Sequence, residues 1–166
     1  MATQSIEELL DAKEVFKGKV IGIEPGAGLM RITREEAIPG YGLNDWELVE
    51  SSTPGMVAEL EKAVSTKNPI VVTLWSPHWA FEEFNLRYLE DPKGLMNPNG
   101  VEELQSIGRL GFANEYPEVT EWLSKFSITS EQLALLEAEI IKAENEVEGV
   151  ENWLVDHKSV TDEWFR

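Results

Sequence analysis

The chain has 166 residues, 42% of them hydrophobic, and a formal net charge of −17 at pH 7. This length fits one domain with a real core, and the strong negative charge argues against nucleic acid or an anionic membrane surface as a partner. Because the chain has no cysteine, disulfides, thiolate catalysis and Cys-based zinc sites are excluded.

The first half of the chain predicts alternating helices and strands. Ser5 with Glu8 forms a capping-box pattern, Asn68-Pro69 breaks a helix, and Ile70 to Leu74 is a β-branched apolar run typical of a buried parallel strand. Helices are expected over 5–16, 29–37 and 53–64, and Thr53-Pro54 is expected to cap the third of them. Strands are expected over 19–23, 46–50 and 70–75. This βαβαβ order is typical of a parallel, doubly wound sheet.

The second half predicts fewer strands and more helix. Ser76-Pro77 resembles an N-cap followed by a first helical residue, and Thr129 to Gln132 is a capping box. Helices are expected over 78–84, 117–125 and 129–148, with helical tails at 149–157 and 161–165. Strands are expected over 86–89 and 107–113, and residues 91–100 form a loop.

A glycine-rich turn follows the first expected strand. Gly26-Ala27-Gly28-Leu29 delivers backbone N–H groups at the start of a helix, which is a ready anion site. The pattern lacks the later glycine and acidic residue of a dinucleotide fingerprint and the Gly-Lys-Ser/Thr of a P-loop. Since the turn holds no Lys or Arg, a small carboxylate fits better than a phosphate. The alternative is a glycine-rich connection that binds nothing.

Trp75 ends the third expected strand, which we expect to be central in the sheet. Ligands of open α/β sheets bind at that edge, and an aromatic face there suits a cation or a stacked ring. The alternative is that Trp75 is a core residue. Because the turns after the first and third strands share one edge, Gly28, Leu29 and Trp75 together predict a site for a zwitterion. The hydroxyls of Ser51 to Thr53 could line it, although helix capping is the more common role.

The sequence offers little catalytic chemistry. His78 stands alone near this edge and is expected to make a structural hydrogen bond, and two isolated histidines provide no metal site. No nucleophile has a base and an orienting group, so we predict neither catalytic residues nor a cofactor. No run approaches the roughly 18 apolar residues of a membrane helix. No secretory signal is present, so the protein is cytoplasmic or its targeting segment lies outside this chain.

Several motifs together resemble the glycine betaine-binding proteins of osmoprotectant ABC importers (the OpuAC type). The first is Gly18 to Met30, which includes the glycine-rich turn, and the second is Pro69 to Trp79, which includes Trp75. Residues 43–48, 86–94, 151–154 and 163–164 continue the resemblance, which covers almost the whole chain.

The resemblance implies a three-layer αβα sandwich with a mostly parallel sheet, as one lobe of a type II periplasmic-binding-protein fold. Residues 1–166 then form a single α/β lobe, and the family's second lobe is absent. The Gly28 and Leu29 amides would bind a carboxylate, and Trp75 would form one wall of a tryptophan cage for trimethylammonium. The other tryptophans and the carboxylate-binding histidine belong to the second lobe, so His78 takes no ligand role.

The implied function is recognition of a betaine-like zwitterion outside the cytoplasm, with no enzymatic activity. Its implied partners are the second lobe and an ABC permease in the membrane, and no nucleic acid. An alternative is an interaction module that pairs with a separate half or with itself. Whether the chain is an excised domain, part of a fusion or a natural half stays open.

Overall fold

The structure is a computed structural model that describes residues 3–98, 100 and 103–165. The chain divides into two compact units. The first consists of residues 1–74 and 87–101, and the second of residues 75–86 and 102–166. The chain therefore leaves the first unit directly after Leu74 and Trp75 opens the second.

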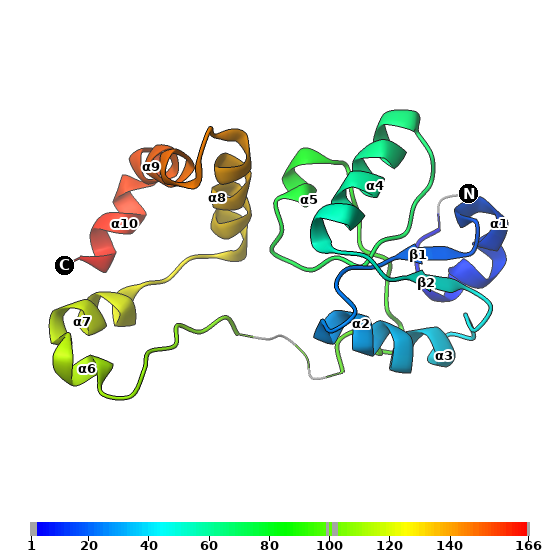
Figure 1. Cartoon of the computed structure of the whole chain (residues 1–166), viewed down its shortest axis with the longest axis horizontal. Coiled ribbons are helices and arrows are strands. Elements are labelled where there is room, and N and C mark those ends of the chain that lie inside the picture. Colours follow the sequence, from blue (N-terminus) through cyan, green and yellow to red (C-terminus); the bar gives the residue numbers. More distant parts are fainter. Residues whose placement is uncertain (1–2, 99, 101–102, 166) are drawn as a thin grey trace. The chain divides into compact units, whose positions relative to one another are not determined.

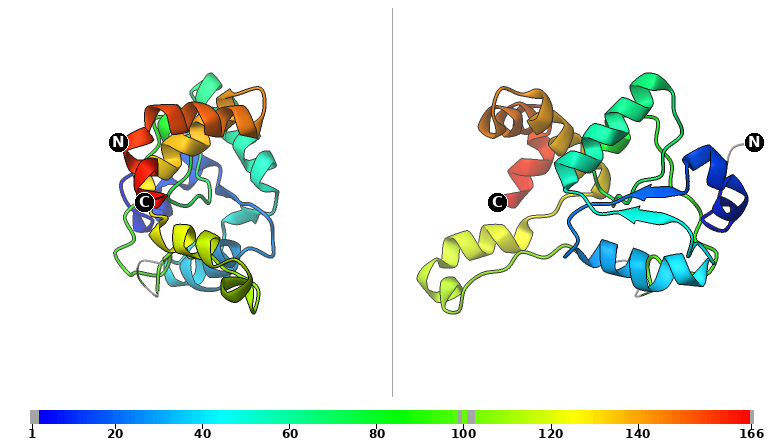
Figure 2. Two further views of the ribbon diagram at one scale, coloured as in Figure 1. Left: turned by 90° about the vertical axis from the view of Figure 1, so that its left-hand side faces the viewer. Right: turned by 45° about the vertical axis from the view of Figure 1, so that its right-hand side comes forward.

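A small parallel sheet lies at the centre of the first unit. Its two strands pair with Lys19 opposite Glu47, and helices lie on both of its faces, α4 on one and α2 with α3 on the other (Figures 1 and 2). The elements of this unit are η1 (Glu7–Ala12), α1 (Lys13–Phe16), β1 (Lys19–Ile21), α2 (Gly28–Ile32), the π-helical η2 (Thr33–Ala37), α3 (Ile38–Gly40), β2 (Glu47–Val49) and α4 (Thr53–Thr66).

The third expected strand is reduced to a single parallel bridge, between Ile21 and Val72. Two hydrogen bonds hold it, from the Ile21 N–H to the Val71 carbonyl and from the Thr73 N–H to the Ile21 carbonyl, each 2.9 Å. Pro69 has no N–H to donate and the chain enters the other unit at residue 75, so the pairing stays short. In the described residues β1 is therefore the central strand, and the prediction of a central strand ending at Trp75 is wrong.

The predicted three-layer sandwich is accordingly confirmed only in part. The parallel pairing and the helices on both faces are present, but among the described residues the named strands number two and helices dominate. The predicted strand over 86–89 is also wrong, because these residues lie in no strand and the adjacent Glu90 forms only a single bridge, with Ser5.

Two apolar clusters stabilise the first unit. One gathers buried residues of η1, β1, η2 and the segment before β2, namely Leu9, Val20, Ala37, Tyr41, Leu43 and Trp46. The other joins Ile23 after β1 to Met30 of α2 and Met56 of α4. Leu74, the last residue before the chain leaves this unit, packs against the second cluster. That cluster therefore anchors the end of the third segment beside the glycine-rich turn.

The second unit is helical. Its elements are α5 (Ala80–Glu83), α6 (Phe112–Glu115), α7 (Pro117–Lys125), α8 (Ser130–Lys142), α9 (Glu146–Asp156) and α10 (Lys158–Trp164). The capping box of Thr129 and Gln132 opens α8 as predicted. The helix ends at Lys142 rather than near 148, because the Asn145 side chain accepts a hydrogen bond from the Glu148 N–H (3.0 Å) and starts α9.

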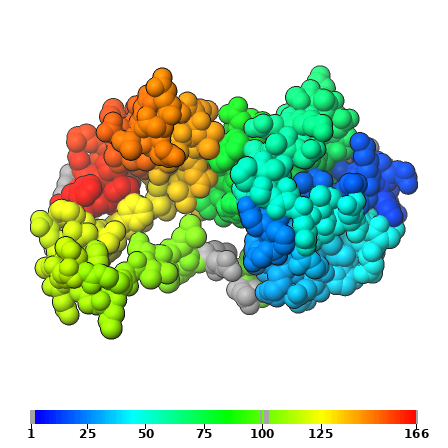
Figure 3. All heavy atoms as spheres, viewed as in Figure 1, coloured from blue at the N-terminus to red at the C-terminus, as the bar shows by residue number. Residues whose placement is uncertain are grey.

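Helices α8 and α9 pack closely (Figure 3, gold and orange atoms). Gly149 permits this approach, since a Cβ at that position would lie 2.5 Å from the Ile140 Cα and 2.9 Å from the Glu139 carbonyl oxygen. Trp153, one turn further along α9, is among the largest fully buried side chains. These two helices therefore meet backbone against backbone at Gly149.

The expected strand over 107–113 is wrong. Residues 103–110 lie in no helix or strand, and α6 begins at Phe112 after Gly111, whose φ is +84°. Gly108 and Gly111 weaken a strand intrinsically. No strand of the described residues pairs with this segment, so the apolar side chains of Leu104, Ile107 and Leu110 remain exposed.

Candidate functional site

The glycine-rich turn begins where β1 ends. The Gly22 N–H donates to the Val49 carbonyl (2.9 Å), and the Ala27 N–H closes the turn on the Glu24 carbonyl (2.9 Å). Ala27 is extended and α2 begins at Gly28 without a side-chain cap. The N–H groups of Gly28 and Leu29 donate to no residue that the structure describes. The predicted pair of unsatisfied amides is therefore present at the start of this helix.

The space beside these amides is open. A Cβ built at Gly26 or Gly28 would meet nothing within 4 Å, and neither residue has a positive φ. Neither the backbone conformation nor the packing therefore requires glycine here. Glycine does leave the amides accessible to an approaching group, which is the arrangement an anion site needs.

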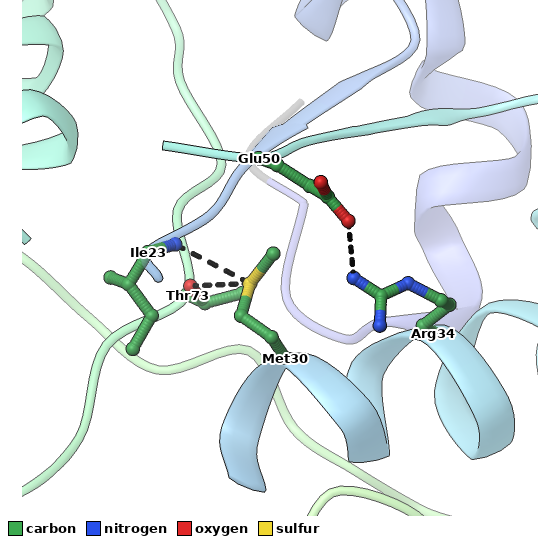
Figure 4. A network of polar contacts seen from close by, with 5 residues as sticks. All are labelled: Ile23, Met30, Arg34, Glu50 and Thr73. Atoms are coloured by element: carbon green, nitrogen blue, oxygen red, sulfur yellow. Dashed lines mark hydrogen bonds and ion pairs between the residues drawn. The ribbon is translucent and has the colours of Figure 1, made fainter. Parts of the chain in front are cut away.

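Met30 holds the turn in place (Figure 4). Its side chain is fully buried, and its Sδ accepts from the Ile23 N–H (3.3 Å) and the Thr73 hydroxyl (3.8 Å). The sulfur thus joins α2 to the end of β1 and to the third segment. Arg34, one turn along, pairs with Glu50 after β2 at 2.6 Å. No local pattern indicated the role of Met30, because Thr73 lies 43 residues further along the chain.

Glu24 ties the glycine-rich turn to the start of α4. Its carboxylate accepts from the Thr53 N–H and from the Thr53 hydroxyl, each at 2.8 Å, and these bonds hold the pKa of Glu24 below its usual range. Ser52, the actual cap of α4, accepts from the Gly55 N–H (3.2 Å). Ser52 therefore serves helix capping, whereas the Thr53 hydroxyl binds Glu24. No local pattern in the sequence indicated the contact between Glu24 and Thr53.

Trp75 opens the second unit and is partly exposed, at 39%. The prediction that Ser76-Pro77 caps a helix is wrong, because α5 begins at Ala80, with Trp79 in the N-cap position and no side-chain cap. The Trp75 indole instead meets the His78 imidazole edge-on, with ring centroids 4.8 Å apart and planes at 88°. The Trp75 indole thus packs against His78, and the remainder of the side chain is exposed to solvent.

His78 is buried and makes the structural hydrogen bond that was predicted for it. Its Nδ1 accepts from the Ala80 N–H (3.1 Å), and burial lowers the pKa of the imidazole. Glu137 of α8 accepts from the Trp79 N–H (3.0 Å). Burial raises the pKa of this carboxyl, partly offset by that hydrogen bond. Glu137 lies nearly sixty residues away in sequence, so no local pattern could have identified it.

Gly28 and Leu29 belong to the first unit, whereas Trp75 belongs to the second. Their meeting at one edge therefore stays a prediction. Across the described ranges 3–98, 100 and 103–165, no group of three His, Asp or Glu side chains could hold a metal ion. In the same ranges no helix has the length and apolar character needed to cross a bilayer.

The family model for the substrate-binding domain of ABC-type glycine betaine transport systems matches residues 2–156. The chain belongs to this family. Its members bind substrates and are not enzymes, which agrees with the absence of catalytic residues predicted from the sequence.

The relatives include a curated protein and several solved structures. The chain is 34% identical to the glycine betaine/carnitine transport binding protein GbuC of Listeria monocytogenes, over 93% of this chain and 51% of that protein. It is 36% identical to lactococcal OpuAC in its closed form with glycine betaine, with a TM-score of 0.84, over 100% of this chain and 63% of that one. A choline-binding protein in complex with choline is 26% identical, with a TM-score of 0.75. This match covers 98% of this chain and 57% of that one.

These matches show that the fold is part of a periplasmic-binding-protein fold. The chain spans about half the length of the curated relative and about three fifths of the solved chains. The relatives therefore contain a substantial part of the fold that this sequence does not.

Proposed function

We propose that this chain recognises glycine betaine or a related quaternary ammonium zwitterion, as the substrate-recognition part of an osmoprotectant ABC importer outside the cytoplasm. The observation that carries the proposal is the open glycine-rich turn with the unsatisfied N–H groups of Gly28 and Leu29. These amides receive the carboxylate, and the open face of Trp75 receives the trimethylammonium group. A membrane permease is the partner that takes up the released substrate.

Both ends of such a zwitterion have a matching chemistry in this chain. A cation over an indole is attracted by about 0.5–2 kcal/mol, and hydrogen bonds to a charged group contribute about 1.5–3 kcal/mol each. Choline has no carboxylate and would leave the two amides unused. The turn therefore favours glycine betaine over choline, although the solved relatives include complexes with both.

Affinity is expected to be weak for the chain alone. It supplies only part of the binding-protein fold, which we propose is one lobe, so water is not excluded from a bound ligand and the second lobe's contacts are missing. We expect glycine betaine to bind with a Kd of about 1 mM or weaker, and choline more weakly still. Isothermal titration calorimetry measures the two affinities, and light scattering on the same sample gives the oligomeric state. Micromolar binding by a monomer would contradict this expectation.

A second candidate function is an interaction module that pairs with a separate half or with itself. Three apolar residues of one short segment favour it, because Leu104, Ile107 and Leu110 are 79%, 96% and 101% exposed and exposed apolar surface can mark an interface. A concentration-dependent mass in the light-scattering experiment, without heat from glycine betaine, is the result that would favour this candidate.

A Gly28→Ala variant tests the turn directly. We expect it to fold with unchanged or slightly raised stability, since its Cβ enters open space and alanine favours a helix over glycine by up to about 1 kcal/mol. We also expect the affinity for glycine betaine to fall about tenfold, because the methyl group occupies the approach to the amides, at a cost near 1.4 kcal/mol. Thermal unfolding and an NMR titration measure the two effects.

Gly22→Ala is the matched control. Its Cβ would lie 2.4 Å from the Met30 Cε and 2.9 Å from the Val49 carbonyl oxygen. We expect a loss of about 1–3 kcal/mol in the free energy of unfolding, which is typical of overpacking. If Gly28→Ala lost stability like Gly22→Ala, or bound glycine betaine as well as the parent chain, the turn would not be the carboxylate site.

A further inference from the structure

His78 lies within a cluster of rings at the start of the second unit. Its centroid is 4.8 Å from that of Trp75, with the planes at 88°, and 5.5 Å from that of Trp79, with the planes at 29°. His78 is 5% exposed, whereas Trp75 is 39% exposed. The imidazole is therefore the buried support against which the open indole rests.

The orientation and the protonation state of this imidazole are linked. Nδ1 accepts the hydrogen bond from the Ala80 N–H at 3.1 Å, so this nitrogen carries no proton. The ring is then neutral, with its proton on Nε2. Burial acts in the same direction, since it lowers the pKa of His78. Protonation at Nδ1 would break the bond that fixes the ring at the start of α5.

Charged groups from α8 lie against the same cluster. Glu137 accepts from the Trp79 N–H at 3.0 Å, and Lys142 pairs with Glu83 of α5 at 3.9 Å. Glu137 holds the backbone on one side of His78, and the Ala80 bond holds the ring on the other. The bond from Ala80 thus fixes the imidazole, the bond to Glu137 fixes the adjacent backbone, and the Trp75 indole packs against the imidazole.

We infer that His78 is a positioning residue, a neutral imidazole that holds the Trp75 indole in place for a quaternary ammonium ligand. A proton on His78 would release the ring from Ala80 and place a positive charge next to the indole that receives a cation. Ligand binding should therefore weaken as the pH falls through the pKa of His78. This inference rests on the proposed function for its ligand, but the support of Trp75 by His78 can be measured without one.

The first experiment uses the ligand-free chain. NMR with ¹⁵N labelling is expected to show His78 protonated on Nε2 alone at pH 8, with a midpoint below that of an ordinary histidine. The Trp75 indole N–H resonance should shift with the same midpoint. A proton on Nδ1 at pH 8, or a Trp75 resonance that does not move with His78, would overturn the inference.

Two variants distinguish the contribution of the His78 ring from that of its hydrogen bond to Ala80. His78→Asn keeps an acceptor for the Ala80 N–H but removes the ring, whereas His78→Phe keeps a ring but removes the acceptor. We expect each to lower the affinity for glycine betaine about three- to tenfold and to abolish its pH dependence. The parent chain should lose about tenfold between pH 8 and a pH below the His78 midpoint. A merely structural role would lower the melting temperature of both variants and leave the pH profile of binding unchanged.

Glu137→Gln identifies the group that titrates. The inference requires that the pH response of Trp75 persists in this variant and disappears in His78→Asn. The opposite pattern would assign the response to Glu137 and overturn the inference. If glycine betaine bound at no pH, the proposed function would fail, while the coupled titration of His78 and Trp75 would still decide the positioning role.

Discussion

Replacing Trp153 by alanine is expected to reduce the free energy of unfolding of the second unit by about 3–5 kcal/mol. The indole is only 2% exposed and lies in α9, one turn after the glycine that brings α9 onto α8. Its ring stacks on His157 at 4.1 Å with the planes 8° apart. Because the backbones of the two helices already touch, they cannot move closer to fill the cavity, so the loss should be near the upper end.

Trp153→Phe is the matched control. The Trp153 Nε1–H has no hydrogen-bond partner within the part of the chain that the structure describes. Phenylalanine removes this unsatisfied donor and retains most of the apolar ring, so we expect a loss of only about 1 kcal/mol. Chemical denaturation followed by NMR measures each unit separately, and signals from Met30 and Met56 report on the first. A loss below 1 kcal/mol in Trp153→Ala would contradict the packing described here.

The elements predicted correctly are those whose signals are local. The Thr129 and Gln132 capping box opens α8 because its two hydrogen bonds span only three residues. Asn145, equally local, explains why the predicted long helix is two helices. The third strand and the strand over 107–113 were wrong because a strand needs a neighbour, and the apolar composition of a segment does not provide one.

In the candidate site, too, local features were predicted and contacts between distant residues were not. The glycine-rich turn starts a helix as predicted, and the Gly28 and Leu29 N–H groups have no acceptor among the described residues, while their role as a binding site stays a prediction. The groups that hold the site were missed, because each acts across a long stretch of sequence. Met30 reaches Thr73, and Glu137 reaches the Trp79 N–H. Such contacts are set by packing, which a single sequence does not display.

Trp75→Leu is expected to weaken glycine betaine binding by this chain by up to about 30-fold. Cation–π attraction contributes about 0.5–2 kcal/mol, a factor of about 2–30 in affinity, and the starting affinity is already weak. Leucine retains an apolar surface without a π face, whereas Trp75→Phe retains a weaker π face. The affinities should therefore fall in the order Trp, Phe, Leu, as measured by NMR titration. Equal affinities for the three chains would remove Trp75 from the site.

A change of ligand separates charge from shape in the same experiment. In 3,3-dimethylbutanoate a tert-butyl group replaces the trimethylammonium of glycine betaine and the carboxylate is retained. If Trp75 acts through its π face, the parent chain should prefer glycine betaine, and Trp75→Leu should lose most of that preference. Gly28→Ala should weaken both ligands alike, because its methyl group obstructs the carboxylate that they share. A preference that survives in Trp75→Leu would show that another group recognises the cation.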